Sequence, residues 1–272
     1  MMDKHKGFRD LHRSEGCFVL ANAWDAGSAK MLAAAGVQAI GTTSAGLAYA
    51  LGERDEAEAI GLERALENIA EIVAASDLPV SADFENGYAD SPAGVAYAIR
   101  RCAETGAAGA SIEDLPGDPS RGLYDPGFAA ERIAAAVEAA RGLGRPFTVT
   151  ARAESYLVGV PKAADDALDR LQRYAAEGAD CVYAPGVRDR DEIRRLVEET
   201  GAPLNVLIGI KGMEASLDEM QALGVKRLSV GGALSRLAWR AVMDGIAELR
   251  DGRFTFPERM ASDAEILRAM GK

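Results

Sequence analysis

Carboxylates stand where an apolar stretch of the chain ends. In LPVSADFENGYAD, residues 78–90, a proline-bounded apolar run leads directly into Asp83, Glu85 and Asp90. This pattern is typical of a buried strand that ends in a loop. Polar or small residues end other apolar runs of the chain: Thr42, Thr43, Ser44, Glu113, Asp114, Arg152, Glu154, Asn205, Gly231 and Gly232. If these runs are neighbouring strands, opposite charges converge at one rim.

The acidic members of this group predict a divalent cation. Several carboxylates around one opening repel each other and raise each other's pKa unless a cation neutralises them. Carboxylate oxygens without a histidine or cysteine partner favour Mg²⁺ or Mn²⁺, and Mg²⁺ keeps several water ligands. No histidine follows His12, which disfavours catalytic zinc and a histidine general base. The cysteines lack paired metal-ligand spacing and are interpreted as small buried hydrophobes: Cys17, Cys102 and Cys181.

Arg152, which follows the apolar run PFTVTA, predicts an anionic partner. That partner is either Glu113 or Glu154 in a structural ion pair, or a substrate carboxylate or developing enolate oxygen. The segment TTSAGLA offers further donors: the Ser44 side chain and the backbone N–H groups of Ala45 and Gly46. A hard metal, an arginine and backbone donors together suit a 2-oxo acid that loses a C–C or P–C bond next to its carbonyl group.

Four segments share a pattern that indicates the elements positioning these residues. MLAAAGVQAIGTT, CAETGAAGASIED, YAAEGADCVYAPG and MQALGVKRLSVGG each join a helical run, one glycine and a short apolar run. A helix that ends at a left-handed glycine and leads into a buried strand explains this pattern. Strands are expected near residues 17–22, 37–42, 79–84, 108–113, 146–151, 180–184, 204–208 and 226–231, each followed by a helical pattern of ten or more residues.

Alternating strands and helices in this number predict an α/β fold, a (β/α)8 TIM barrel with residues 1–272 as one domain. An open doubly wound sheet is the alternative, although the early G-x-G-x-x-G turn of a dinucleotide-binding sheet is missing. The longest interruptions, 43–61 and 114–127, follow strands and are expected at the C-terminal face, where loops build active sites. Residues 246–272 are interpreted as a C-terminal helical extension of the kind that packs on a neighbouring subunit.

Composition narrows the classes of partner. The chain has 272 residues, of which 48% are hydrophobic, and a net charge of −11. This charge argues against a nucleic-acid or anionic-membrane partner, since both depend on clustered Lys and Arg. The polar N-terminus lacks an apolar signal-like region, and no stretch approaches eighteen uninterrupted apolar residues. A soluble cytoplasmic protein is expected.

Six short motifs in order resemble the isocitrate lyase/phosphoenolpyruvate mutase superfamily over almost the whole chain: NAWDAGSAKMLAAAGVQAIGTTSAGLA, GERDEAE, PVSADFENGY, GASIEDLPG, VTARAES and PLNVL. The resemblance implies a Mg²⁺-dependent (β/α)8 barrel enzyme, with Mn²⁺ as the alternative ion. It also implies a homo-oligomer, a tetramer built as a dimer of dimers, in which neighbouring subunits exchange their last helices.

The resemblance also implies roles for individual residues. Asp83 would be the closest metal carboxylate, and Glu85 and Glu113 would act largely through water. Glu85 stands where the superfamily often has the shorter Asp. Catalytic roles would fall to Asp55, on the GERDEAE loop, and to Arg152 and Glu113. Substrate contacts would come from Thr43, Ser44, Ala45, Gly46, Asp83, Arg152 and, at the distal end, Asn205.

Two departures from the superfamily bear on the reaction. Isocitrate and methylisocitrate lyases carry a Cys-containing loop after the IED strand, whereas here the loop reads LPGDPSRGLYDPG, without Cys, Lys or His. In YAPGV, Gly186 replaces a glutamate of the lyase branches, so that side of the pocket should be roomier and less acidic. A true isocitrate lyase is therefore disfavoured. Arg121 is interpreted as a solvated loop charge, although the phosphonate branch uses polar or basic residues on this loop.

The favoured function is cleavage next to the carbonyl group of a small 2-oxo acid such as oxaloacetate. The alternatives are a phosphonopyruvate mutase or hydrolase, and a barrel that binds 2-oxo acids with little turnover. SVGGAL, starting at residue 229, is also compatible with the glycine-rich phosphate cradle of many barrels. The acidic cluster makes a phosphate-sugar isomerase the weaker interpretation.

Overall fold

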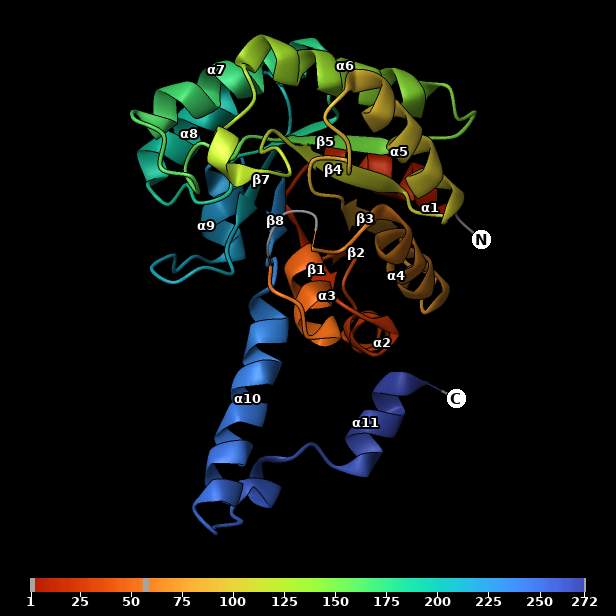
Figure 1. Cartoon of the computed structure of the whole chain (residues 1–272), viewed down its shortest axis with the longest axis vertical. Coiled ribbons are helices and arrows are strands. Elements are labelled where there is room, and N and C mark those ends of the chain that lie inside the picture. Colours follow the sequence, from red (N-terminus) through yellow and green to blue (C-terminus); the bar gives the residue numbers. More distant parts are fainter. Residues whose placement is uncertain (1–2, 56–58, 272) are drawn as a thin grey trace.

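Eight parallel strands close into a barrel in the order of the sequence. The computed structural model describes residues 3–55 and 59–271. It confirms the predicted (β/α)8 barrel and excludes the open doubly wound sheet (Figure 1). All expected strands are present within one or two residues at each end: β1 Phe18–Ala23, β2 Ala39–Thr42, β3 Val80–Asp83, β4 Gly109–Glu113, β5 Thr148–Arg152, β6 Cys181–Tyr183, β7 Leu204–Leu207 and β8 Arg227–Ser229.

The repeated helix–glycine–strand joints have the conformation that the sequence pattern predicts. The glycines of these joints, Gly36, Gly106, Gly178 and Gly224, all have φ between 80° and 93°. This left-handed conformation ends a helix at little cost only for glycine. Each joint therefore returns the chain directly from the outer helical layer to the next strand.

The helices mostly surround the barrel, as expected. They are α1 Lys4–Arg13, α2 Ala26–Ala34, α3 Ser44–Leu51, α4 Leu62–Ala74, α5 Pro92–Glu104, α6 Pro126–Arg141, α7 Ala163–Ala176, α8 Arg190–Glu199, α9 Leu217–Ala222, α10 Ala233–Arg250 and α11 Asp263–Met270, with short 3-10 turns η1 Pro119–Arg121 and η2 Phe256–Arg259. Three details differ from the prediction. Helix α1 precedes the first strand, α3 fills the first half of the 43–61 segment, and α9 has only six residues.

Helix α1 covers the N-terminal end of the barrel. Its Phe8 and His12 are buried, and their rings contact each other and Phe18 edge to face. Phe8 also belongs to an apolar cluster with Leu20 and Ala39, at the beginnings of the first strands. The strand ends that carry the charged residues lie at the opposite face.

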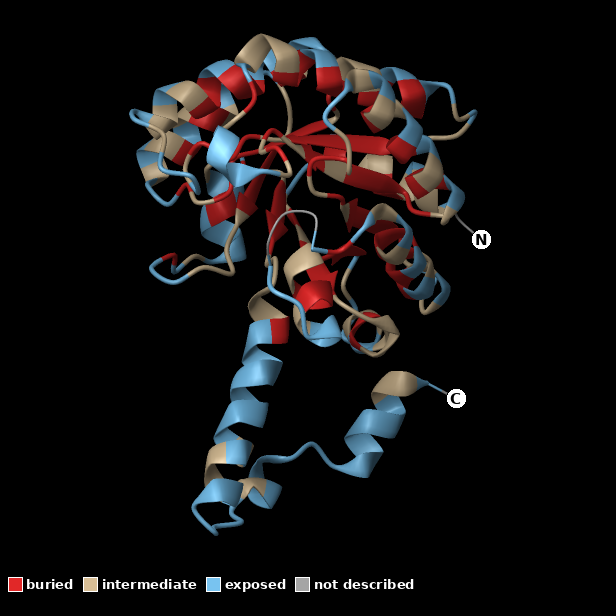
Figure 2. Ribbon diagram, in the orientation of Figure 1, coloured by how far each residue is buried: buried red, intermediate tan, exposed pale blue. Residues whose placement is uncertain are grey.

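The C-terminal segment leaves the barrel. Helix α10 runs without a break through residue 246, where the sequence predicted the extension to begin, and it projects from the barrel in Figure 1. The chain then turns at η2, and α11 returns to contact α2 of the same chain, where the Met270 side chain approaches Gly27. Most of α10 and α11 is exposed (Figure 2). Exchange of these helices between subunits stays a prediction.

Within residues 3–55 and 59–271, every helix is too short or too polar to cross a membrane.

Candidate active site

A cavity of about 650 Å³ opens at the C-terminal face of the barrel. It brings together nearly all the predicted site residues: Thr43, Ser44, Ala45, Asp55, Asp83, Glu85, Glu113, Arg152 and Asn205 line it. Gly46 does not line the cavity. The last residues of the GERDEAE motif, 56–58, lie outside the described residues.

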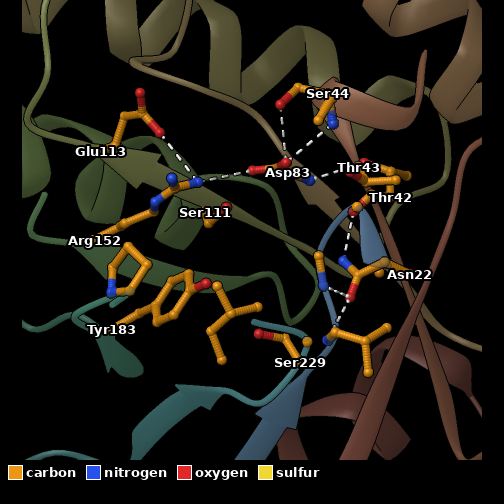
Figure 3. A pocket seen from close by; sticks show the side chains of 18 of the residues that line it. Asn22, Thr42, Thr43, Ser44, Asp83, Ser111, Glu113, Arg152, Tyr183 and Ser229 are labelled. Atoms are coloured by element: carbon orange, nitrogen blue, oxygen red, sulfur yellow. Dashed lines mark hydrogen bonds and ion pairs between the residues drawn. The ribbon is translucent and has the colours of Figure 1, made fainter. Parts of the chain in front are cut away.

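Asp83, the last residue of β3, has donors on both sides (Figure 3). Its Oδ2 accepts hydrogen bonds of 3.0 Å from both the backbone N–H and the hydroxyl of Ser44. Its Oδ1 lies 3.3 Å from Nη1 of Arg152. Its own N–H donates to Oγ1 of Thr42 at 2.9 Å. The carboxylate is therefore fixed at the first turn of α3, where the helix dipole also favours negative charge.

Gly46 has another use than the predicted contact with substrate. Its N–H donates to the side chain of Thr43, the N-cap of α3, at 3.3 Å. A Cβ at Gly46 would lie 2.6 Å from Thr43 Cγ2 and 2.8 Å from Trp24 Cβ, so only glycine fits there. In this structure Gly46 supports the turn that presents Ser44.

Arg152 lies among three carboxylates. Nη1 is 3.1 Å from Glu113 Oε2 and 3.3 Å from Asp83 Oδ1, and Nε donates to Glu154. Its guanidinium also lies 5.5 Å from the centre of the Tyr183 ring, within range of a cation–π contact. Burial opposes the charge of Arg152, but Glu113, Glu154 and Asp83 more than offset this effect and raise its pKa. Both predicted ion-pair partners are confirmed.

Three acids of the cavity retain a proton more readily than usual: Asp55, Glu113 and Glu154, whose pKa burial also raises. Burial raises the pKa of Glu113 well above its ordinary value; Arg152 opposes this shift, and the nearby Glu154 adds to it. Partial desolvation at the cavity mouth and the charge of Asp83 raise the pKa of Asp55. Acids with raised pKa values next to an arginine are typical of sites that transfer protons.

Glu85 lies in a backbone conformation that is unusual for its residue type. Its φ is 47°, in the left-handed region that few residues other than glycine adopt. Its C=O accepts the Glu113 N–H at 2.9 Å, which ties the end of β3 to the end of β4. Such strain is concentrated at functional sites.

The donor set suits a hard cation held partly through water. Asp83, Glu85 and Glu113 offer only oxygen ligands and line one cavity, as Mg²⁺ requires. Among the described residues, however, no three acidic, His or Cys side chains converge closely enough to hold an ion directly. Arg152 lies between Asp83 and Glu113 instead. The residues fit an ion that has one close carboxylate and keeps several waters, as the sequence predicted.

Asn22 is a cavity residue that the sequence analysis missed. Its Oδ1 accepts the backbone N–H groups of Val230 and Gly231 at 3.0 and 2.9 Å, and its Nδ2 donates to the Thr42 carbonyl oxygen at 2.7 Å (Figure 3). Asn22 thus joins the ends of three strands. Asn22 thereby takes two of the N–H groups of SVGGAL that the predicted phosphate cradle would use, those of Val230 and Gly231. A polar residue within the apolar run FVLANA was the available signal.

The sequence analysis also missed Arg132, which holds the backbone next to Glu85 and Glu113. It is almost fully buried, and it donates to the carbonyl oxygens of Asn86, Ala89, Asp90 and Glu113. These bonds hold the loop that follows Glu85. Nothing in the helical pattern around residue 132 signals this role.

The 114–127 loop covers part of the cavity mouth. Leu115 and Pro119 line the cavity, while Arg121 lies 2.9 Å from Asp90 and the Tyr124 hydroxyl also donates to Asp90. The predicted interpretation of Arg121 as a solvated charge is thus incomplete, because it forms an ion pair although it is exposed. Asp90 anchors the loop.

Asp114 and Gly186 shape the surroundings. Asp114 is buried and accepts hydrogen bonds from the Tyr174 hydroxyl, Arg170 and the Glu154 N–H, outside the cavity lining.

At Gly186, φ is 96°, and a Cβ would lie 3.0 Å from Tyr156 Cβ. The backbone here excludes the glutamate of the lyase branches, and Leu157 and Pro185 line the cavity nearby.

Comparison with known proteins supports the same family. The family described as phosphoenolpyruvate phosphomutase matches residues 8–250. A solved structure from Burkholderia cenocepacia J2315, assigned only provisionally as a lyase or mutase, has a TM-score of 0.93 at 49% identity and covers 97% of this chain and 94% of its own. The oxaloacetate decarboxylase of Pseudomonas fluorescens Pf-5 is 30% identical over 257 residues, which are 91% of this chain and 85% of that protein.

A phosphonopyruvate hydrolase, solved with oxalate and Mg²⁺, has a TM-score of 0.85 at 25% identity and covers 98% of this chain and 95% of its own. The matched family, the barrel and the convergence of the predicted residues agree. The chain therefore belongs to the phosphoenolpyruvate phosphomutase family, within the PEP mutase/isocitrate lyase superfamily.

Proposed function

We propose that the chain is a Mg²⁺-dependent enzyme that cleaves the carbon–carbon bond next to the carbonyl group of a small 2-oxo acid such as oxaloacetate. The observation that carries this proposal is the position of Arg152 between Asp83 and Glu113 in one cavity. Oxygen ligands and an arginine thus meet where a 2-oxo acid would present its carbonyl and carboxylate oxygens. Similarity to an oxaloacetate decarboxylase supports the choice of substrate.

The donors that now bind Asp83 would bind the substrate once a cation is present. Asp83 would hold the cation directly, and Glu85 and Glu113 would hold it through water. The two hydrogen bonds that Ser44 now gives to Asp83 are the donors that a substrate carboxylate needs. If Asp83 turns toward a cation, the hydroxyl and the N–H of Ser44 become available to the substrate, next to the Ala45 N–H. Metal binding would therefore prepare the carboxylate site.

Bond cleavage moves an electron pair onto the 2-oxo oxygen. In an oxaloacetate-like substrate the bond breaks between the leaving carboxylate and C3, the carbon next to the carbonyl group. CO₂ departs, the electron pair forms the enolate, and C3 then takes up a proton to give pyruvate. Arg152 stabilises the negative charge that develops on the oxygen. Mg²⁺, when bound, supplies further positive charge to the same oxygens. Glu113 or Asp55, whose pKa values are raised, would hold the proton that the carbon takes up.

Phosphonopyruvate chemistry is the second candidate, because the matched family is described as a phosphomutase. The same head-group contacts would hold phosphonopyruvate, and a P–C bond would break instead of a C–C bond. A barrel that binds 2-oxo acids with little turnover is the third.

One assay separates these candidates. A panel of 2-oxo acids and phosphonopyruvate is incubated with Mg²⁺, and pyruvate, CO₂ and phosphate are measured. We expect pyruvate and CO₂ from oxaloacetate above the metal-catalysed background, and loss of this excess in EDTA and in Asp83→Ala. Phosphate from phosphonopyruvate would favour the second candidate. Full turnover in EDTA would reject the proposal, and thermal stabilisation by 2-oxo acids without product would favour a binding protein.

We also propose that the chain forms a homo-oligomer through its last helices. Helix α10 exposes large apolar side chains, including Leu237, Val242, Met243 and Ile246. A groove of about 480 Å³ lies between α3 and α10 and includes Tyr49, Trp239 and Met243. Exposed apolar surface of this kind typically marks an interface. A second copy of the chain would cover it, in a dimer of dimers with exchanged helices.

A further inference from the structure

The floor of the cavity carries a buried cation that the proposed chemistry does not use. Arg227, the first residue of β8, lines the cavity and is only 2% exposed. Its Nε donates to Asn205 Oδ1 at 2.9 Å, and its Nη1 donates to Thr150 Oγ1 at 3.1 Å and to His12 Nε2 at 3.2 Å. Within the described part of the chain, no carboxylate forms an ion pair with it.

All partners of Arg227 are neutral. A guanidinium has only donors, so His12 Nε2 must accept, and the proton of the His12 ring lies on Nδ1, which faces the Phe8 carbonyl oxygen at 2.9 Å. This assignment agrees with burial, which lowers the pKa of His12 to about 3. Among the residues that the structure describes, the positive charge of Arg227 is therefore not paired with a carboxylate. A buried charge without an opposite partner is costly unless a ligand supplies one.

The floor also presents donors rather than acceptors. Nη2 of Arg227 has no acceptor among residues 3–55 and 59–271. Because Asn205 Oδ1 accepts from Arg227, the NH₂ group of Asn205 faces Ser229. Its Nδ2 donates a hydrogen bond to Ser229 Oγ at 2.9 Å. The second amide hydrogen of Asn205 is a further donor beside the cavity, and the Ser229 hydroxyl also contacts Tyr183. This arrangement complements an anion.

The floor lies about one layer of side chains below the rim. Thr150, which accepts from Arg227, precedes Arg152 by two residues on β5, so both side chains point into the barrel. At a rise of about 3.3 Å per residue, the separation along the strand is about 7 Å. This is comparable with the length of a short dicarboxylate. Above the floor, the charged residues of the cavity lining are acidic apart from Arg152 and Arg236, whereas the floor carries Arg227.

We propose that Arg227 forms a second anion subsite, on the floor of the cavity, which receives the distal carboxylate of a dicarboxylic 2-oxo acid whose 2-oxo end lies at Asp83 and Arg152. The inference rests on the proposed function and specifies its substrate class. Arg227 binds the distal carboxylate, and Asn205 and Ser229, oriented by Arg227, add hydrogen bonds. A monocarboxylic 2-oxo acid leaves this subsite empty.

The test compares ligands that differ only at the distal end. Binding of 2-oxoglutarate and of 2-oxopentanoate, in which a methyl group replaces the distal carboxylate, is measured by calorimetry with Mg²⁺. We expect the wild type to bind the dicarboxylate at least about tenfold more tightly. In Arg227→Gln this ratio should fall to within about twofold, while the affinity for 2-oxopentanoate is unchanged. Arg227→Lys keeps the charge without the fork and should give an intermediate ratio.

The matched control is Arg145→Gln. Like Arg227, Arg145 contacts a histidine ring nitrogen, that of His5, and it donates to the carbonyl oxygens of Ala103 and Ala107. It does not line the cavity, so its loss should leave the ratio unchanged. Circular dichroism checks the fold of each variant, and Arg227→Lys serves as the test if Arg227→Gln does not fold.

Two results would overturn the subsite. Equal weakening of both ligands in the Arg227 variants would make Arg227 a structural cation only. The second is a thermal stabilisation by inorganic phosphate that adds to the stabilisation by 2-oxoglutarate. Both ligands would then bind at the same time, and the floor would hold a free anion instead of the distal carboxylate. The outcome is separable from the proposed function. Metal-dependent turnover without dicarboxylate preference rejects only the subsite, and preference that depends on Arg227 without turnover rejects only the enzyme.

Discussion

Among single residues, Arg152 carries the charge balance of the cavity rim. Its contacts with Asp83, Glu113 and Glu154 keep several buried carboxylates close together. The same guanidinium is the group proposed to stabilise the developing oxyanion. Stability and activity should therefore both depend on this one side chain.

Replacement of Arg152 tests this dual role. Arg152→Ala leaves buried acids without their cation, so we expect a loss of about 3–5 kcal/mol in the free energy of unfolding. Turnover should fall by about a hundredfold or more. Urea unfolding and the pyruvate assay measure the two effects. Arg152→Lys should restore part of the stability but little of the activity, because an ammonium group cannot reproduce the planar fork. Full activity in Arg152→Lys would contradict the proposed role.

His12 should make stability depend on pH. Burial lowers its pKa from 6.5 to about 3. Between these values the unfolded chain binds a proton that the folded chain does not, so stability is lost as pH falls below about 6.5. This contribution should reach about 2 kcal/mol at pH 5.

His12→Gln keeps an acceptor for Arg227 and removes the titration. Urea unfolding from pH 5 to pH 7.5 should show that the variant loses less stability on acidification than the wild type. His5→Gln is the comparison variant and should have a smaller effect, since burial also lowers the pKa of His5 but His5 is only partly buried. Parallel pH profiles for wild type and His12→Gln would show that His12 is protonated in the folded state.

Among the elements, the 114–127 loop is held to the barrel at its start by Arg170 and Tyr174, which bind Asp114, and further along by Asp90. Arg121 and Tyr124 both approach Asp90, which follows β3. Because Leu115 and Pro119 of the same loop line the cavity, the position of the loop sets access to the site. The loop lies at the cavity mouth, and Asp90 binds it through Arg121 and Tyr124.

Asp90→Asn should loosen this loop. The neutral amide loses the ion pair with Arg121 and weakens the hydrogen bond from Tyr124. We expect faster cleavage after Arg121 by trypsin, which limited proteolysis and mass spectrometry would detect. Asp118→Asn is the control, because Asp118 bonds only within the loop, to Ser120. Equal cleavage rates in wild type and Asp90→Asn would show that other contacts hold the loop.

The sequence predicts elements better than it predicts contacts between them. The glycine joints locate the strands, and residues at strand ends such as Asp83 and Arg152 locate the rim, because parallel strands bring these ends together. Arg132 and Arg227 escape prediction because their roles come from partners distant in the sequence. Arg132 is a helix residue among alanines, and Arg227 begins a strand whose first side chain happens to point into the barrel.

At the scale of the whole molecule, the projecting helix α10 predicts association. Met243→Glu places a charge in the groove between α3 and α10, so we expect it to shift the chain toward smaller species in light-scattering chromatography. Leu217→Glu is the control, since Leu217 is an exposed apolar residue on α9 instead. A wild type that is monomeric at micromolar concentration would reject the proposed oligomer.

Helix α1 has a consequence for the electrostatics inside the barrel. Phe8 and His12 are buried at the end of the barrel opposite the cavity mouth, where they limit the access of water to the interior. Without Phe8 and His12, solvent would enter the barrel from both ends and screen the charges of the interior, as added salt weakens a surface ion pair. A short N-terminal segment thus limits the access of solvent to the half of the barrel that holds the cavity.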